Sequence, residues 1–549
     1  MPNLREKFAD SAGFLVGVEL VSTRGTVNET RVGRTVAFAR DLAASPRVDW
    51  VSITDNAGGN PMLSPAALGG PLRDAGREVV IHLSCKDFNR NGLESEAWHL
   101  ASEGFHNLLV LSGDSSGTGI AGGAKPVFDI DSVGLLTLLG QMNAGLDVTR
   151  PGAKRLTRLA PTRFFNGCVV TNFKLHENEV IPQLLKLEKK IACGAGWVVN
   201  QIGYDARKIS ELIAWMHRRG LGHAPLIGNV YVLNPAVARL FREQRIPGVV
   251  ISDPLAAVCE RHAASPDKGR AFFLELAARQ MAIYRGLGYR GAYLGGVHAV
   301  EDVEHVLALE STFAPDDWRQ FARELRYSRP GEFFCFAENP ATGLADPTRL
   351  APDYAASLEK PRATKNITIG YRFSKFVHEV MFTPGTFSWR AGSRLCAGAK
   401  DPAQGPWLMR AAEHLGKSVM FGCKDCGDCS LPDIAFLCPE SACAKNQRNG
   451  PCGGTRDGKC EVADFECIWA RAYDRLKYEG RADELLAHAP VLQDQNLRGT
   501  SSWANTWLGR DHLAKERRTV EGGGQKADDS RGRTKRPRTS DLRSHPATK

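Results

Sequence analysis

Eight short apolar runs, each followed by a helix-like stretch, dominate the first 300 residues. The runs are rich in Val, Ile and Leu and cover residues 13–20, 48–54, 78–84, 106–112, 167–172, 196–202, 225–231 and 291–296. After the fifth run, Val180, Leu184, Leu187 and Ile191 mark one apolar helix face, which Gly194 ends. Eight alternating units of the α/β class predict a closed (β/α)8 TIM barrel. An open doubly wound sheet is the alternative.

The rest of the chain changes composition in steps. We expect a catalytic barrel at 1–310, a connector at 311–399, a cysteine-rich metal-binding domain at 400–475, a helical closing segment at 476–514 and a disordered basic tail at 515–549. The tail holds eleven Lys/Arg and five Asp/Glu, which is most of the net charge of +10. The folded part is therefore nearly neutral, and nucleic acid is not an expected partner.

The hydropathy pattern predicts a cytoplasmic protein. No run of 18 apolar residues occurs in the 549-residue chain, so we expect no membrane span. The first residues, MPNLREKFADSAGF, lack the apolar stretch of a secretory signal.

Eight of the 14 cysteines fall between residues 423 and 467, a density that in a cytoplasmic protein indicates metal more often than disulfides. The predicted metal ligands are Cys423, Cys426, Cys429, Cys438, Cys443, Cys452, Cys460 and Cys467. C-x2-C-x2-C followed by Cys-Pro is similar to the cluster ligation of bacterial ferredoxins, although the gap before Cys438 is longer. A zinc site that only folds a small domain is the alternative.

Polar residues stand at or near the ends of six successive predicted strands. They are Glu19, Thr54, His82, Asp114, Asn172 and Gln201. A single buried His or Gln is usually a hydrogen-bonded core residue. Functional groups of a TIM barrel, however, gather at the carboxyl ends of its strands. The six residues together therefore predict one shared site.

The segments VGVELV, VSITDNAGGN, IHLSCKDFNRNGLESEAWHLASEGFHNLLVLSGD and LLKLEKKIACGAGWVVNQIGYD resemble 5,10-methylenetetrahydrofolate reductase, over about residues 12–300. The resemblance implies a barrel that binds FAD and tetrahydrofolate and interconverts 5,10-methylene- and 5-methyltetrahydrofolate in one-carbon metabolism and methionine biosynthesis. It also implies a homo-oligomer and either NAD(P)H or a ferredoxin-like protein as electron donor.

The resemblance also implies roles for individual residues. Glu19 would be the acid that protonates the folate N10, Asp114 the carboxylate between flavin and folate, and Gln201 the amide that binds the pterin. Flavin contacts are expected from Thr54, His82, Asp114, Asn172 and Lys190.

Two positions depart from the family pattern. Pro235 stands where an aromatic residue of the seventh loop is often found, which argues against nicotinamide as the direct donor. Ser112 replaces a basic residue before Gly113-Asp114, which keeps open a flavin-free barrel that binds folate or a methyl carrier and serves methyl transfer.

The cysteine-rich segment has a resemblance of its own. It is similar to the C-terminal domain of some methylenetetrahydrofolate reductases and to the small subunit of acetogen reductases, which implies [4Fe-4S] clusters or zinc. A zinc-containing protein associated with nucleic acid, which would use the cysteine-rich segment and the basic tail, is a further alternative.

Overall fold

The computed structural model describes residues 2–10, 13–30, 32–115, 118–119, 122–149, 155–243 and 248–514. The tail at 515–549, for which the sequence predicts disorder, lies outside these residues. Among the helices of the described part, none is long and apolar enough to cross a membrane.

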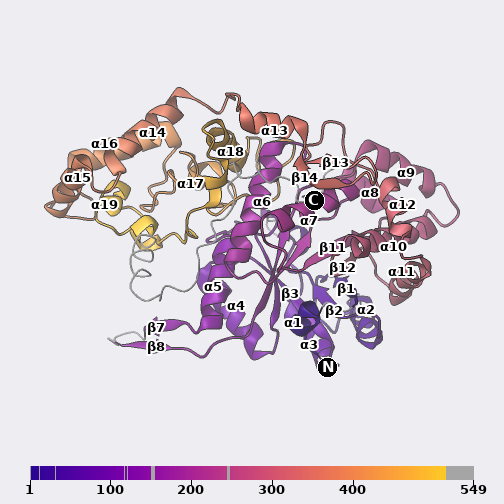
Figure 1. Cartoon of the computed structure of the whole chain (residues 1–549). Coiled ribbons are helices and arrows are strands. Elements are labelled where there is room, and N and C mark those ends of the chain that lie inside the picture. The colour runs from indigo at the N-terminus through magenta and orange to yellow at the C-terminus, as the bar shows by residue number, and fades with distance from the viewer. Residues whose placement is uncertain are drawn as a thin grey trace, which may run out of the picture. The chain divides into compact units, whose positions relative to one another are not determined.

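Eight parallel strands close into a barrel in the order β1-β12-β11-β10-β9-β4-β3-β2 (Figure 1). Their bounds are β1 Leu15–Leu20, β2 Trp50–Ile53, β3 Glu78–Ser84, β4 Asn107–Leu111, β9 Phe165–Val170, β10 Trp197–Asn200, β11 Leu226–Tyr231 and β12 Gly291–Gly295. All eight predicted strands are therefore present, and the predicted TIM barrel is confirmed. The open doubly wound sheet is wrong because β1 pairs with both β2 and β12.

Helices surround this ring of strands (Figure 1). They are α2 Gly33–Ala44, α3 Pro65–Asp74, α4 Arg90–Ser102, α5 Ser132–Ala144, α6 Glu177–Ala192, α7 Ala206–Arg218, α8 Pro235–Arg242, α9 Asp253–Ala263, α10 Arg270–Gly286, α11 Val300–Thr312 and α12 Asp317–Glu324. In α6, the apolar residues predicted to form one face are indeed buried at Val180, Leu184 and Leu187.

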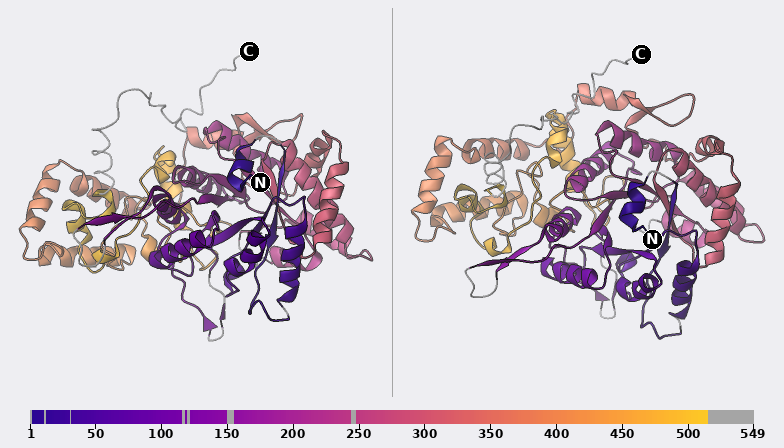
Figure 2. Two further views of the ribbon diagram at one scale, coloured as in Figure 1. Left: turned by 90° about the horizontal axis from the view of Figure 1, so that it is seen from below. Right: turned by 60° about the horizontal axis from the view of Figure 1, so that its bottom comes forward.

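The N-terminal helix α1, Leu4–Ala9, covers the end of the barrel at which the strands begin (Figure 2). Its Phe8 ring packs edge-on against Trp50 and Trp197, with ring centroids 5.5 Å apart in both pairs. Gly167 makes room for this packing, because a Cβ there would lie 2.2 Å from the Trp197 ring. This end of the barrel is therefore filled by aromatic side chains, and the opposite end is left for polar groups.

Several short strands and helices lie outside the eight-stranded barrel sheet. The antiparallel pairs are β5 Thr118–Gly119 with β6 Gly122–Gly123, β7 Asp147–Thr149 with β8 Leu156–Arg158, and β13 Phe336–Glu338 with β14 Ala345–Leu350. A 3-10 turn, η1 Ala57–Gly59, follows β2, and α13 Pro352–Glu359 follows β14.

Packing divides the chain into two compact units. Unit 1 comprises Met1–Ala356 together with Cys452–Glu461, and unit 2 comprises Ser357–Pro451 together with Val462–Lys549. A ten-residue piece of the cysteine-rich segment thus packs with the barrel. The elements of unit 2 after α13 are α14 Ile369–Phe382, α15 Phe387–Ala397, α16 Trp407–Phe421, α17 Pro439–Ala442, α18 Ile468–Tyr478, η2 Ala482–Leu486, η3 Gln495–Leu497 and α19 Ser502–Trp507.

Candidate active site

A chain of hydrogen bonds crosses the barrel interior near the carboxyl ends of four neighbouring strands. The Tyr293 hydroxyl on β12 donates to Glu19 Oε1 on β1 at 3.2 Å. Ser52 on β2 also hydrogen-bonds the Tyr293 side chain, and its Oγ lies 2.9 Å from Nε2 of His82 on β3. The sequence-predicted residues Glu19 and His82 are thus joined through two residues that the sequence did not single out, Tyr293 and Ser52.

Burial changes the protonation of both ends of this chain. It raises the pKa of Glu19 from 4.5 to about 7, and the hydrogen bond from Tyr293 offsets only part of that rise. Burial lowers the pKa of His82 from 6.5 to about 4, so the imidazole is neutral at pH 7. A Cβ at Gly295 would lie 2.7 Å from Glu19 Oε2, so a glycine is needed beside this carboxyl group. Near neutral pH, Glu19 can therefore hold a proton or release it.

A second polar group follows β2, β3 and β4. Asp55 accepts a hydrogen bond of 2.6 Å from the Ser84 hydroxyl, and burial raises its pKa. The backbone N–H of Gly58 in η1 donates to Asp114 Oδ2 at 3.1 Å. The contact fixes the position of Asp114, a predicted catalytic residue, over the carboxyl end of the barrel.

Two other predicted residues, Thr54 and Gln201, lie at strand ends beside the barrel's own loops. The Thr54 hydroxyl is buried and accepts a 3.1 Å hydrogen bond from the backbone N–H of Ser22. Gln201 follows β10, and its Nε2 would lie 2.9 Å from a Cβ at Gly248, a residue with φ of +81°. The Gln201 amide therefore occupies space that only a glycine at 248 leaves free.

Asn172 and Lys190 point into the layer between strands and helices. Asn172 Nδ2 donates to the backbone oxygen of Lys208 on α7 at 2.7 Å. Lys190 lies on α6, and its ammonium donates to the carbonyl of Val169 on β9 at 2.7 Å. Burial lowers the pKa of Lys190 to about 8. In this conformation both donors are used by the barrel wall, and their role as flavin contacts stays a prediction.

Residues 452–461 of unit 1 lie at the carboxyl ends of β9 and β10. The buried ammonium of Lys174 donates to the Thr455 carbonyl at 2.6 Å, and Arg329 pairs with Asp457 at 2.6 Å. A Cβ at Gly453 would meet Thr171 and Gln183 at 3.6 and 3.7 Å. This segment therefore forms part of the wall around the end of the barrel, next to the loop that holds Gln201.

Several buried polar atoms beside this segment have no hydrogen-bond partner among the described residues. They include Thr171 Oγ1, Asn172 Oδ1 and Gln183 Nε2, whose side chains are at least nine-tenths buried. Such atoms are costly when left unpaired, and a polar ligand beside residues 452–461 would satisfy Thr171 and Gln183. The amide and hydroxyl groups of a flavin or a pterin are of this kind.

Replacing Lys174 by Met should release residues 452–461 from the barrel. The buried bond to Thr455 is charge-assisted, so its loss is expected to cost about 2 kcal/mol locally. We expect faster amide hydrogen exchange in 452–461 than in the wild type. The matched control is Lys424→Met at an exposed position of unit 2, which should leave exchange in 452–461 unchanged. Equal exchange in K174M and the wild type would contradict this role.

In unit 2, Cys423, Cys426, Cys429 and Cys438 line one small cavity. The backbone N–H of Asp425, a residue with φ of +55°, donates to Cys423 Sγ at 3.4 Å. No group of three or more His, Cys, Asp or Glu that could hold a metal ion is present in the described part of the chain. Four of the eight predicted ligands thus share a cavity, whereas metal binding stays a prediction.

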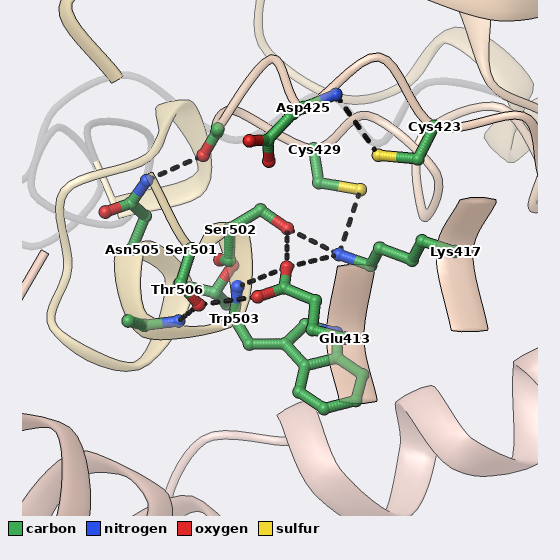
Figure 3. Close-up of polar contacts among 12 residues, drawn as sticks. Glu413, Lys417, Cys423, Asp425, Cys429, Ser501, Ser502, Trp503, Asn505 and Thr506 are labelled. Carbon is green, nitrogen blue, oxygen red and sulfur yellow. Dashed lines mark hydrogen bonds and ion pairs between the residues drawn. The ribbon is translucent and has the colours of Figure 1, made fainter. Parts of the chain in front are cut away.

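A buried carboxylate supports this cavity (Figure 3). Glu413 on α16 accepts hydrogen bonds from the hydroxyls of Ser501 and Ser502 at 2.6 and 2.7 Å. It also pairs with Lys417 at 3.0 Å, and the Lys417 ammonium lies 3.8 Å from Cys429 Sγ. Lys417 therefore places a positive charge beside one thiol of the cavity.

Sequence comparison relates part of this chain to a known family. Residues 406–495, which include all eight clustered cysteines, match the family described as methylene-tetrahydrofolate reductase C terminal. The chain matches no curated protein.

Two solved structures are among those with a weak similarity to this chain. A Clostridium thermocellum protein that binds two copies of 5-methyl-5,6,7,8-tetrahydrofolic acid is 11% identical, with 56% of this chain and 97% of that chain covered and a TM-score of 0.39. Clostridium difficile dihydropteroate synthase, crystallised with pteroic acid, is 11% identical, with coverages of 55% and 98% and a TM-score of 0.31. These likenesses are too weak to carry an argument about ligands. The match of residues 406–495 to the family described as methylene-tetrahydrofolate reductase C terminal supports a folate-related role.

Proposed function

We propose that this protein is a flavin-dependent oxidoreductase that interconverts 5,10-methylenetetrahydrofolate and 5-methyltetrahydrofolate. The observation that carries the proposal is the Glu19 carboxyl group, whose pKa of about 7 suits an acid that must donate a proton at neutral pH. The match of residues 406–495 to the reductase family supports the same chemistry.

In this proposal, each predicted site residue has a separate role in proton transfer or in binding. Glu19, held by Tyr293, would protonate N10 of the methylene folate as the carbon–nitrogen bond opens. Asp114 would lie beside the bound ring systems and Gln201 would hydrogen-bond the pterin. Thr54 and His82 would hold FAD, which supplies the hydride when bound. Because His82 is neutral, it can orient a ring without adding charge to it.

The four cysteines around the unit 2 cavity would hold a [4Fe-4S] cluster or zinc. A cluster there would allow a ferredoxin-like protein to supply electrons. Lys417 would then act on the cluster through Cys429, because a cation near a ligating thiolate stabilises the more negative, reduced state.

Cofactor analysis of the full chain, purified without oxygen, tests the proposal. We expect about one flavin per chain and bleaching of its visible absorption on addition of 5-methyltetrahydrofolate. Flavin-free protein that still binds 5-methyltetrahydrofolate would favour the methyl-transfer barrel instead. Bound flavin that the folate does not reduce would also contradict the proposal. Iron, sulfide and zinc contents from the same preparation identify the metal.

A further inference from the structure

Two helices of unit 2 expose apolar side chains along one stripe each. On α14, the exposed fractions are 87% for Ile369, 55% for Phe373 and 62% for Phe376, and these residues repeat at a spacing of three or four. Such a stripe lies on a single helix face. On α16, Leu408, Leu415 and Val419 are 64%, 68% and 78% exposed. Large apolar side chains gathered on one surface indicate a binding face rather than scattered surface residues.

A groove of about 250 Å³ lies between these helices. Phe373 and Val377 of α14 and Met420 of α16 line it, together with Trp503 of α19. The buried Glu413 and its partner Lys417, an ion pair drawn in Figure 3, also border this groove. The surface is thus concave, and a partner must present a convex apolar ridge to fill it.

Charge around the groove is predominantly positive. Residues 369–421 hold seven Lys/Arg and three Asp/Glu. Lys375, Arg410 and Lys417 are ion-paired with Glu479, Asp425 and Glu413, which leaves four cations for the groove surface. Of the other two acids, Glu379 lies 3.9 Å from Lys375, and Asp401 accepts a hydrogen bond from the Ala403 backbone. Arg372 follows Ile369 and precedes Phe376 by one helical turn, so it flanks the apolar stripe. A partner with carboxylates beside its apolar ridge is therefore complementary to this surface.

Three other occupants fit less well. The C-terminal tail, 515–549, has only Val520 and Leu542 as large apolar residues and a surplus of six positive charges, so it matches neither the groove nor its charge. A second copy would place the same basic surface opposite itself, because a two-fold interface uses the same patch twice. A bilayer surface could take up exposed apolar residues but has no ridge to fill the groove.

We propose that the surface of α14 and α16 is a docking site for an amphipathic helix of a partner protein, with an apolar ridge that enters the groove and flanking carboxylates. This is the helix-in-groove mode of recognition, in which apolar anchors recur at positions i, i+3, i+4 and i+7. The proposal does not depend on the reaction catalysed by the barrel.

The test uses the full chain and a fluorescent synthetic helix with Leu at those four anchor positions and Glu on both flanks. We expect saturable binding by fluorescence anisotropy, weakened about tenfold or more in the double variant Phe376→Ser, Leu415→Ser. Both side chains are exposed, so the variant should fold. The control is Leu156→Ser on β8, where the side chain is 64% exposed, and it should bind as the wild type does.

Three further measurements could overturn the proposal. Equal binding of a helix with Lys in place of Glu would remove the argument from charge. A wild-type dimer in light scattering that becomes a monomer in the double variant would assign the surface to a second copy. Sedimentation with phosphatidylglycerol vesicles that the double variant loses would assign it to a membrane. Absence of any saturable peptide binding would refute it outright.

Discussion

Replacing Glu19 by Gln is expected to lower kcat for methylenetetrahydrofolate reduction by about 100- to 10,000-fold, the usual contribution of a general acid. Glutamine keeps the size of the side chain and an acceptor for the Tyr293 hydroxyl, but it has no acidic proton. Flavin content and folate binding should therefore stay close to those of the wild type. Stopped-flow measurement of each half-reaction separates these quantities, and a variant with full activity would remove Glu19 from its role.

The pH dependence provides an independent check of the same residue. Because the acid must be protonated, the wild-type rate of folate reduction should fall as pH rises above about 7, the raised pKa of Glu19. The E19Q variant should lose this fall. Tyr293→Phe removes the hydrogen bond that lowers the pKa, so the fall should move to higher pH. A profile that is unchanged in Y293F would contradict the assignment.

Stability should respond to the same shift with a defined sign. The folded pKa of Glu19, about 7, lies above the unfolded value of 4.5, so its contribution is most favourable below pH 4.5 and is lost as pH rises through 7. At pH 8, E19Q should consequently be more stable than the wild type, by up to about 3 kcal/mol.

The second large effect is expected in unit 2, where replacing His512 by Ala should lower the free energy of unfolding by about 3–5 kcal/mol. His512 Nδ1 lies 2.5 Å from Asp428 Oδ1, and Nε2 lies 2.9 Å from Asp433 Oδ2. All three side chains are buried. Removing the imidazole leaves two carboxylates with no cation between them, in the loop that carries Cys426 and Cys429.

Calorimetry of the full chain measures this effect, since each unit can give its own transition. One transition should move down by on the order of 10 °C in H512A. His414, exposed on α16, provides the matched control, and H414A should leave both transitions in place. The two carboxylates raise the pKa of His512 well above 6.5, so its stabilisation is complete below pH 6.5 and is lost as pH rises through the folded pKa. If neither transition moved in H512A, the contacts of His512 with Asp428 and Asp433 would contribute nothing to the free energy of unfolding.

The barrel and most of its polar residues could be predicted from local sequence patterns. The periodicity of apolar residues shows which side of each strand and helix is buried. Eight successive strand–helix units of this kind are typical of a closed parallel barrel. The acid Glu19 and the neutral His82 stand at strand ends, a place that the chain order alone specifies. Tyr293 and Ser52 were not predicted as site residues, because each stands within an apolar strand and not at its end. Tyr293 reaches Glu19 only because β12 pairs with β1 when the barrel closes.

The amino-acid sequence by itself determined the barrel, the strand ends that face one another and the dense group of cysteines. Tertiary structure decided which cysteines share a cavity and which segment packs with the barrel. Cys452 and Cys460 lie in residues 452–461, which pack with the barrel in unit 1. Lys174 binds the backbone carbonyl of Thr455 and Arg329 binds the side chain of Asp457, and these two contacts hold the segment there. The orientation of Lys190 toward Val169 was likewise decided by packing. The physical reason is that sequence periodicity shows which residues of one helix or strand are buried. It does not show which residues of different elements contact each other. The contacts of Lys174 and Arg329 join residues more than a hundred positions apart, and that of Lys190 joins helix α6 to strand β9.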